Sequence, residues 1–383
     1  MDPVANPYTP NAGSPPAELA GREEQLEQFR VLVERLKRGA TDQSMVVRGP
    51  RGVGKTVLLN AFESRAESVG FLTYYHELTP DSSLIEALAR DTGSALVRLS
   101  LTQRLAARVR STFARLKTLR LTAPEGFEVA VELGGSNEGT ITADLTELFL
   151  EIGAVAKEQD TGIAFFLDEV QFVREVEYRA LISALHRCTQ KQLPITAAAA
   201  GLPQIPRLSG EARSYAERLF TFPEIANLEQ DAAASAFTGP ASREGVEFDR
   251  DALDEAIRWT QGYPFYIQQL GKHVWNRASA SPINVDTVTA AEPAAQHALD
   301  TSIYQVRLQR STPAERQYMR AMSTLGTGPY KSGDVAGQAG RSVNALSPVR
   351  EALLTKGLIY ATEDYGYLDF TIPRFDEFLR RAS

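Results

Sequence analysis

A glycine-rich run near the amino terminus carries the clearest chemistry in the sequence. Its residues are Gly49-Pro50-Arg51-Gly52-Val53-Gly54-Lys55-Thr56. The spacing G-x-x-x-x-G-K-T is typical of a loop whose backbone N–H groups surround the β-phosphate of a nucleotide. The lysine would then reach the β- and γ-phosphates, and the threonine hydroxyl would coordinate Mg²⁺. We therefore predict that these residues and the next one, Val57, bind ATP or ADP with Mg²⁺.

A pair of carboxylates ends the most apolar segment of the chain. Ile163-Ala164-Phe165-Phe166-Leu167 runs directly into Asp168 and Glu169. Carboxylates at the carboxyl end of a buried parallel strand lie where such sheets bind ligands. Asp168 is suited to hold the magnesium ion together with Thr56. Glu169 is suited to orient or deprotonate an attacking water, so we predict Glu169 and Lys55 as catalytic residues.

Alternating strands and helices are expected to position these groups. Hydrophobic patterning predicts strands at 44–48, 70–78, 162–169 and 193–200, and helices at 23–37 and 55–68. The alternation favours an α/β fold with a mostly parallel sheet buried on both faces. A basic segment, residues 98–120, and a hairpin at about 116–133 are expected as an insertion between the second and third strands.

Composition limits the functional classes. The chain has 383 residues, of which 43% are hydrophobic, and this is enough for two or three domains with buried cores. The net charge of -7 argues against a chain-wide basic surface for nucleic acid. The single cysteine, Cys188, cannot form a disulfide within the chain or a cysteine-based zinc site. No leader pattern and no apolar run of roughly 18 residues occurs, so we expect a cytoplasmic protein with no membrane contact.

These motifs, together with Ala20-Gly21-Arg22-Glu23-Glu24, resemble those of AAA+ and STAND-type P-loop ATPases. The resemblance covers roughly residues 19–383 and points especially to the archaeal and origin-recognition-like group. It implies a parallel-sheet P-loop core, an α-helical lid and a C-terminal winged helix-turn-helix domain. It also implies that Gly21 and Arg22 lie near the adenine, although a glycine that caps the following helix explains Gly21 equally well.

Two more segments are similar to boxes of these ATPases. Gln261-Gly262-Tyr263-Pro264 matches the GxP box of STAND proteins, which implies that Gly262 and Pro264 bind the nucleotide and that Pro264 packs on the adenine. The segment 214–220 is similar to the one that places an arginine finger, which implies that Arg218 is a catalytic residue for a neighbour's γ-phosphate. A finger of this kind implies a homo-oligomer in the ATP state. The alternative is an exposed or ion-paired arginine.

Two departures from the family pattern favour a switch with slow hydrolysis over a motor. Phe265 follows Pro264 where typical AAA+ proteins carry an arginine. The strand that ends at Gly201 lacks the polar residue expected to position water, and Thr196 and Gln204 are its nearest substitutes.

We predict four regions along the chain. They are an extended arm at 1–18, the ATPase core at 19–228, the lid and a connecting helix at 229–310, and the winged helix at 311–383. DNA is a candidate partner of 311–383, although a winged helix that holds the ATPase shut is an equal alternative. DNA is also a candidate partner of residues 98–120, whose cations alternatively form a solvated helix face.

The predicted function is therefore that of an ATP-binding protein and Mg²⁺-dependent ATP hydrolase that acts as a nucleotide-controlled switch. The alternative function is a nucleotide-gated protein-interaction scaffold or regulator with little hydrolysis and no DNA binding.

Overall fold

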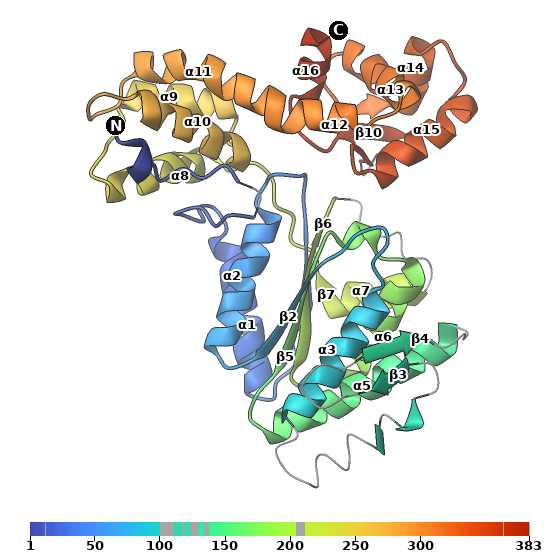
Figure 1. Ribbon diagram of the computed structural model, residues 1–383. Helices are drawn as coiled ribbons and strands as arrows, with labels where there is room; N and C mark the ends of the chain where they lie inside the picture. Colours follow the sequence, from blue (N-terminus) through green and yellow to red (C-terminus); the bar gives the residue numbers. More distant parts are fainter. Residues whose placement is uncertain are drawn as a thin grey trace.

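The computed structural model describes residues 1–11, 13–99, 111–112, 114–116, 119–122, 130–133, 138–203, 211–362 and 364–382 (Figure 1). Most of the basic segment 98–120 lies outside the described residues, as does Gln204. Within the described part of the chain, no helix is long and apolar enough to cross a membrane.

A five-stranded parallel sheet forms the centre of the core. Its strands are β1 (Ser44–Arg48), β2 (Leu72–Glu77), β5 (Ile163–Asp168), β6 (Ile195–Gly201) and β7 (Phe220–Thr221). Their order is β2-β5-β6-β1-β7, and every neighbouring pair is parallel. The predicted α/β fold with a mostly parallel sheet is therefore confirmed. The register pairs Arg48 with Gly201 and Glu77 with Asp168, so the carboxyl ends of β1, β2, β5 and β6 meet at one edge.

Helices cover both faces of this sheet (Figure 1). The helices α1 (Glu23–Lys37) and α2 (Lys55–Ser68) pack on one face, in a cluster that contains Phe166. The helices α3 (Leu84–Leu99), α5 (Glu138–Glu158) and α6 (Glu175–Gln190) pack on the other, in a cluster that contains Phe165. The predicted hairpin is present as β3 (Leu119–Thr122) paired antiparallel with β4 (Ala130–Leu133). A short helix, α7 (Glu211–Leu219), leads into β7.

Four helices follow the core and form the lid. They are α8 (Gln230–Arg243), α9 (Arg250–Thr260), α10 (Pro264–Arg277) and α11 (Val285–Leu299). The amino-terminal arm packs against them. Its Tyr8 is 2% exposed, and the Tyr8 hydroxyl donates a hydrogen bond of 2.6 Å to the Phe237 carbonyl. The arm thus extends the lid core.

A π-helical turn (Asp300–Tyr304) and α12 (Gln305–Gln309) connect the lid to the last part of the chain. That part, here named the C-terminal domain, contains α13 (Pro313–Thr324), β8 (Tyr330–Lys331), α14 (Ser332–Gln338), α15 (Val343–Thr355), β9 (Ile359–Ala361), β10 (Tyr367–Phe370) and α16 (Phe375–Arg381). Its strands form an antiparallel sheet in the order β8-β10-β9. The domain is winged-helix-like, as the family resemblance implies, and β8 and α16 are elements that the sequence did not predict.

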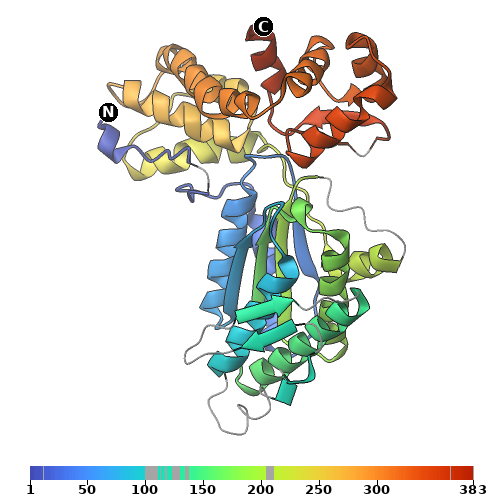
Figure 2. The same ribbon diagram turned by 45° about the vertical axis from the view of Figure 1, so that its right-hand side comes forward.

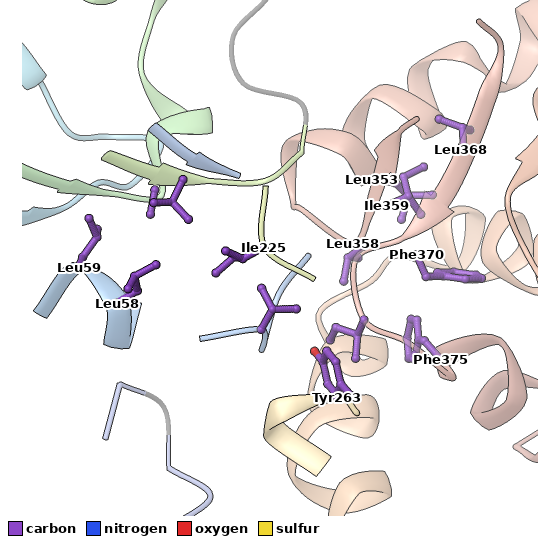
Figure 3. Close-up of a cluster of buried hydrophobic side chains, with 14 of the residues drawn as sticks. Leu58, Leu59, Ile225, Tyr263, Leu353, Leu358, Ile359, Leu368, Phe370 and Phe375 are labelled. Atoms are coloured by element: carbon purple, nitrogen blue, oxygen red, sulfur yellow. The ribbon is translucent and has the colours of Figure 1, made fainter. Parts of the chain in front are cut away.

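The lid and the C-terminal domain both lie at the end of the core where the strands finish (Figure 2). One hydrophobic cluster joins the C-terminal domain to the core. Figure 3 shows Leu58 and Leu59 of α2, Tyr263 of the lid and Leu358 of the C-terminal domain within this cluster. The three parts of the molecule therefore meet above the glycine-rich loop.

Candidate nucleotide site

The glycine-rich loop connects β1 to α2, as its sequence predicts. The strand ends at Arg48, and α2 begins at Lys55 after Gly54, whose φ of 93° is left-handed. No side chain caps the amino end of α2. Its first N–H groups and the positive end of its dipole therefore point toward the position of a bound phosphate. Val57 lies in the first turn of this helix.

Lys55 is buried against its own loop. Its Nζ donates hydrogen bonds to the carbonyls of Gly49 at 3.0 Å and Pro50 at 2.7 Å. Burial lowers the pKa of this ammonium to about 8, although Glu169 and Asp168 favour the charged form. A phosphate would stabilise the charged form further, because it would bring an opposite charge into a poorly solvated place.

Thr56 and Asp168 lie side by side at the end of β5. The Thr56 hydroxyl donates to Asp168 Oδ2 at 2.6 Å, and the Tyr75 hydroxyl donates to the same oxygen at 3.2 Å. Asp168 is 3% exposed. A hydroxyl and a carboxylate at this point are oxygen ligands of the kind that Mg²⁺ accepts, usually together with water and phosphate oxygens. The donor set, the uncapped helix and the buried lysine fit a magnesium nucleotide.

Glu169 is restrained by two polar side chains. Its carboxylate forms an ion pair with Arg51 at 3.1 Å and accepts a hydrogen bond from the Gln171 side-chain amide. Its backbone is left-handed, with φ of 56°, which is uncommon for a residue with a side chain. The sequence predicted Glu169 as an activator of water. In this arrangement its carboxylate is occupied by Arg51, a contact that the sequence did not predict.

Gln171 is the polar side chain that reaches the end of β6. Its Oε1 accepts a hydrogen bond from the Leu202 N–H at 3.1 Å. Thr196 was expected as a substitute at this place, and this expectation is wrong. Thr196 lies near the start of β6, buried against the Ser44 hydroxyl at 2.9 Å, because only the last residues of a parallel strand reach the loop edge.

Arg22 lies beneath the loop and ties it to the segment before the lid. Its guanidinium donates to the carbonyls of Val53 at 3.2 Å and Ala226 at 2.7 Å. Burial lowers the pKa of Arg22. Gly21 precedes it with a left-handed φ of 67°. The pair thus lies next to the loop, and Arg22 holds the loop backbone directly. The closeness to the adenine that the family resemblance implies stays a prediction.

The box at Gly262 brings the lid to the same loop, chiefly through Tyr263, to which the sequence analysis assigned no role. Gly262 has φ of 68° and lies against the Leu228 carbonyl, so a side chain has no room there. Pro264 starts α10. The residue between them, Tyr263, is 2% exposed, and its hydroxyl donates to the Arg51 carbonyl. That hydroxyl occupies the space that a Cβ on Gly52 would need.

The C-terminal domain also contacts the loop. The Arg51 N–H donates to the Thr371 carbonyl at 3.0 Å. The Thr371 hydroxyl in turn donates to the Gly357 carbonyl at 2.8 Å, and Gly357 lies against the Arg51 guanidinium. Nearby, the Pro373 carbonyl accepts from the hydroxyl of Tyr266 at 2.6 Å. Arg51 is therefore held by the lid, by the C-terminal domain and by Glu169.

Arg218 lies at the other end of the sheet. It is exposed near the end of α7, and its carbonyl accepts a hydrogen bond of 2.9 Å from the Gln43 side chain, just before β1. The loop begins after the last residue of β1, about 16 Å further along at 3.3 Å per residue. Arg218 therefore cannot reach the phosphates of its own chain.

Sequence comparisons agree with this geometry. Residues 18–197 match the model of the AAA ATPase domain family, and residues 301–379 match a domain of unknown function (DUF8462). No protein of curated function matches the chain.

Matches to solved structures span nearly the whole chain. A Walker-type ATPase of Pyrococcus abyssi is 14% identical, with 94% of this chain and 96% of that chain covered and a TM-score of 0.52. The Orc1 protein of Aeropyrum pernix in complex with DNA is 13% identical, with 96% and 94% covered and a TM-score of 0.47. The RuvB Holliday junction branch migration motor of Thermotoga maritima is 17% identical, with 94% and 95% covered and a TM-score of 0.46. The family match, joined to the loop and sheet described above, shows that the amino-terminal part of this chain has an AAA-type P-loop domain.

Proposed function

We propose that this protein is a Mg²⁺-dependent ATPase that acts as a nucleotide-controlled switch, in which the C-terminal domain reads the state of the P-loop. The observation that carries the proposal is that Arg51 contacts both the lid and the C-terminal domain. Its N–H is bonded to Thr371 of the C-terminal domain, and its carbonyl is bonded to Tyr263 of the lid. A change in the loop backbone on nucleotide binding therefore alters contacts to both parts.

The residues of the site divide into binding and catalytic roles. Lys55 and the first N–H groups of α2 bind phosphate, and Thr56 with Asp168 holds the metal ion. Bound ATP with Mg²⁺ supplies a terminal phosphate whose transfer to water releases free energy. Glu169 orients that water and accepts its proton, for which its carboxylate must first leave Arg51. This restraint supports slow hydrolysis while the C-terminal domain is docked.

Nucleotide can shift the switch only through a difference in affinity between docked and released states. The docked state orders the loop through the Arg51 backbone, and it restrains Glu169 through the Arg51 side chain. A γ-phosphate that recruits Glu169 and the loop competes with these contacts, and ADP competes less. We therefore expect ATP to favour release of the C-terminal domain and hydrolysis to restore docking.

Nucleotide binding and turnover by the full chain test the proposal. Lys55→Ala should abolish ATP binding, with Lys37→Ala, a surface lysine of the same core, as the matched control. Glu169→Gln should bind ATP but retain it without turnover, with Glu244→Gln on the lid surface as its control. The proposal fails if the Lys55 and Glu169 variants bind and hydrolyse ATP as the unaltered chain does.

DNA is a second candidate ligand of the C-terminal domain, and one observation favours it. Residues 341–345 are all exposed, and they comprise Arg341, Ser342 and the start of α15, the helix that follows α14. The amino end of the second helix of such a pair is the part that enters a DNA groove. Affinity for duplex DNA that falls with salt and is lost in Arg341→Ala would support this candidate. No affinity at low salt would leave the protein-interaction role.

Arg218 supports a proposal about assembly. Its place near the start of β1 excludes a role in its own site, so a catalytic role requires a second copy. The measurement is mass in solution with ADP and with a non-hydrolysable ATP analogue. A larger ATP-state assembly whose hydrolysis is lost in Arg218→Ala supports the finger, and a chain that hydrolyses ATP as a monomer contradicts it.

A further inference from the structure

Arg307, on the helix that joins the lid to the C-terminal domain, lies close enough to the P-loop residue Arg51 for the two charges to interact. It lies on α12 and is half-buried. The charges that act on its guanidinium include Arg51, Tyr263 and Glu169, all of which surround the loop. Among the described residues, its guanidinium has no hydrogen-bond or ion-pair partner. An arginine at the nucleotide site is therefore left without an anion.

The fold directs Arg307 to this place through an unusual turn. The residues Asp300–Tyr304 form a π-helix, and the Gln305 N–H donates to the Asp300 carbonyl five residues earlier. One extra residue in a turn rotates every later side chain by about 100° around the helix axis, and such turns are frequent at functional sites. Without it, α12 would present a different face to the loop.

Two sets of contacts fix this orientation. Tyr304 is fully buried, and its hydroxyl contacts that of Tyr266 and donates to the Pro373 carbonyl at 3.1 Å. Arg307 lies three residues later and therefore on the same face of the helix. At the other end, Arg316 of α13 donates to the Leu308 carbonyl at 3.0 Å. The position of Arg307 is thus coupled both to the lid and to the C-terminal domain.

The local charges are unbalanced around this arginine. Burial, followed by repulsion from Arg51, lowers the pKa of Arg307 to about 10. The nearby carboxylate, Glu169, is already paired with Arg51 at 3.1 Å. Arg310 adds a further positive charge, and Tyr263 is neutral at physiological pH because burial raises its pKa. An anion placed between these groups would remove the repulsion and restore a partner to the buried guanidinium.

We propose that Arg307 binds the terminal phosphate of a nucleoside triphosphate held by the P-loop. The inference rests on the proposed function, and it adds a ligand residue that comes from outside the AAA-type domain. Because α12 joins the lid to the C-terminal domain, this contact distinguishes ATP from ADP. When residues 371–374 leave the loop, the hydroxyl contact of Tyr304 with Tyr266 keeps α12 with the lid, so Arg307 stays at the phosphate.

The test is the affinity of the full chain for two probes, Mg²⁺ with AMP-PNP and Mg²⁺ with ADP, measured by calorimetric titration. A charged hydrogen bond to phosphate is worth enough that Arg307→Ala should weaken AMP-PNP binding about tenfold or more. ADP affinity should change less than about twofold, because ADP lacks the phosphate concerned. Arg307→Lys, which keeps a charge without the planar fork, should lose part of the preference. Arg320→Ala is the control, since Arg320 is an exposed arginine on α13.

The outcomes separate this inference from the function on which it rests. If the unaltered chain binds both probes and Arg307→Ala leaves the ratio of their affinities unchanged, the inference is overturned and the ATPase proposal stands. If the unaltered chain binds neither probe, both are overturned. Thermal unfolding without nucleotide shows whether Arg307→Ala is folded. If it is not folded, the ratio of AMP-PNP to ADP affinity in Arg307→Lys decides, and an unchanged ratio overturns the inference.

Discussion

Removal of the Tyr263 hydroxyl should weaken the docked state, in which the lid and the C-terminal domain both contact Arg51. This hydroxyl donates to the Arg51 carbonyl from a side chain that is 2% exposed. Tyr263→Phe keeps the ring in the hydrophobic cluster and removes only this bond. The substitution therefore weakens the lid contact to the P-loop without creating a large cavity.

The expected size follows from burial. Leaving a buried carbonyl without its donor costs about 1–3 kcal/mol. If the docked state alone bears this cost, the balance between docked and released states shifts by about 5- to 150-fold. Where docking limits access to the loop, the apparent affinity for ATP rises by at most this factor, because it scales with the fraction of binding-competent molecules.

The assay compares AMP-PNP affinity with thermal stability in two variants. Tyr8→Phe is a close control, because the Tyr8 hydroxyl also donates to a backbone carbonyl, that of Phe237, from a side chain with 2% exposure. Both variants should lose similar thermal stability, and only Tyr263→Phe should bind AMP-PNP more tightly. Equal nucleotide affinities in the two variants, at equal loss of stability, would refute the role assigned to the lid contact.

Three further predictions concern charge. Burial holds the pKa of Lys55 at about 8, and phosphate favours its charged form, so nucleotide binding near pH 8 should take up protons and binding near pH 6 almost none. Calorimetry in buffers of different ionisation enthalpy measures this uptake, and an uptake that does not depend on pH would contradict the prediction. Arg51→Met should free Glu169 and raise kcat about fivefold, the equivalent of about 1 kcal/mol for a partly exposed ion pair. Any change in ATP binding would appear separately in KM. An unchanged or lower kcat would count against the restraint of Glu169 by Arg51. Burial and the neighbouring Glu255 raise the pKa of Glu292 to about 7, above its unfolded value. Its protonated form therefore stabilises the lid at low pH, and this contribution is lost as pH rises through 7. The fall in Tm between pH 5 and 8 should be smaller in Glu292→Gln, and an identical fall would show that Glu292 does not cause the pH dependence.

Local sequence signals predicted the phosphate loop and the elements around it. The helices at 23–37 and 55–68 have the predicted bounds, because periodic apolar residues and a glycine-rich turn are properties of the segment itself. The apolar strand before Asp168 was predicted for the same reason. The two-residue strands β7 and β8 were not predicted, since a pair of residues carries no periodicity.

The parts of the site that sequence reasoning missed depend on distant contacts. Tyr263 and Arg307 come near the P-loop only after the lid and α12 have packed. Gln171 reaches the end of β6 only after β5 and β6 have paired, and no local pattern marks these three residues. Thr371 contributes a backbone carbonyl, which any residue could supply. A polar residue two positions after an Asp-Glu pair, and an aromatic residue between glycine and proline, were the only available signals for Gln171 and Tyr263.

The central claim is that ATP at the P-loop releases the C-terminal domain. Amide hydrogen exchange of the full chain with Mg²⁺, in the presence of ADP or AMP-PNP, tests it most directly. The claim predicts that AMP-PNP slows exchange in residues 49–56 and speeds it in residues 371–374, relative to ADP. Slower exchange in 49–56 with no change in 371–374 would show that the nucleotide binds without releasing the domain, and would contradict the switch.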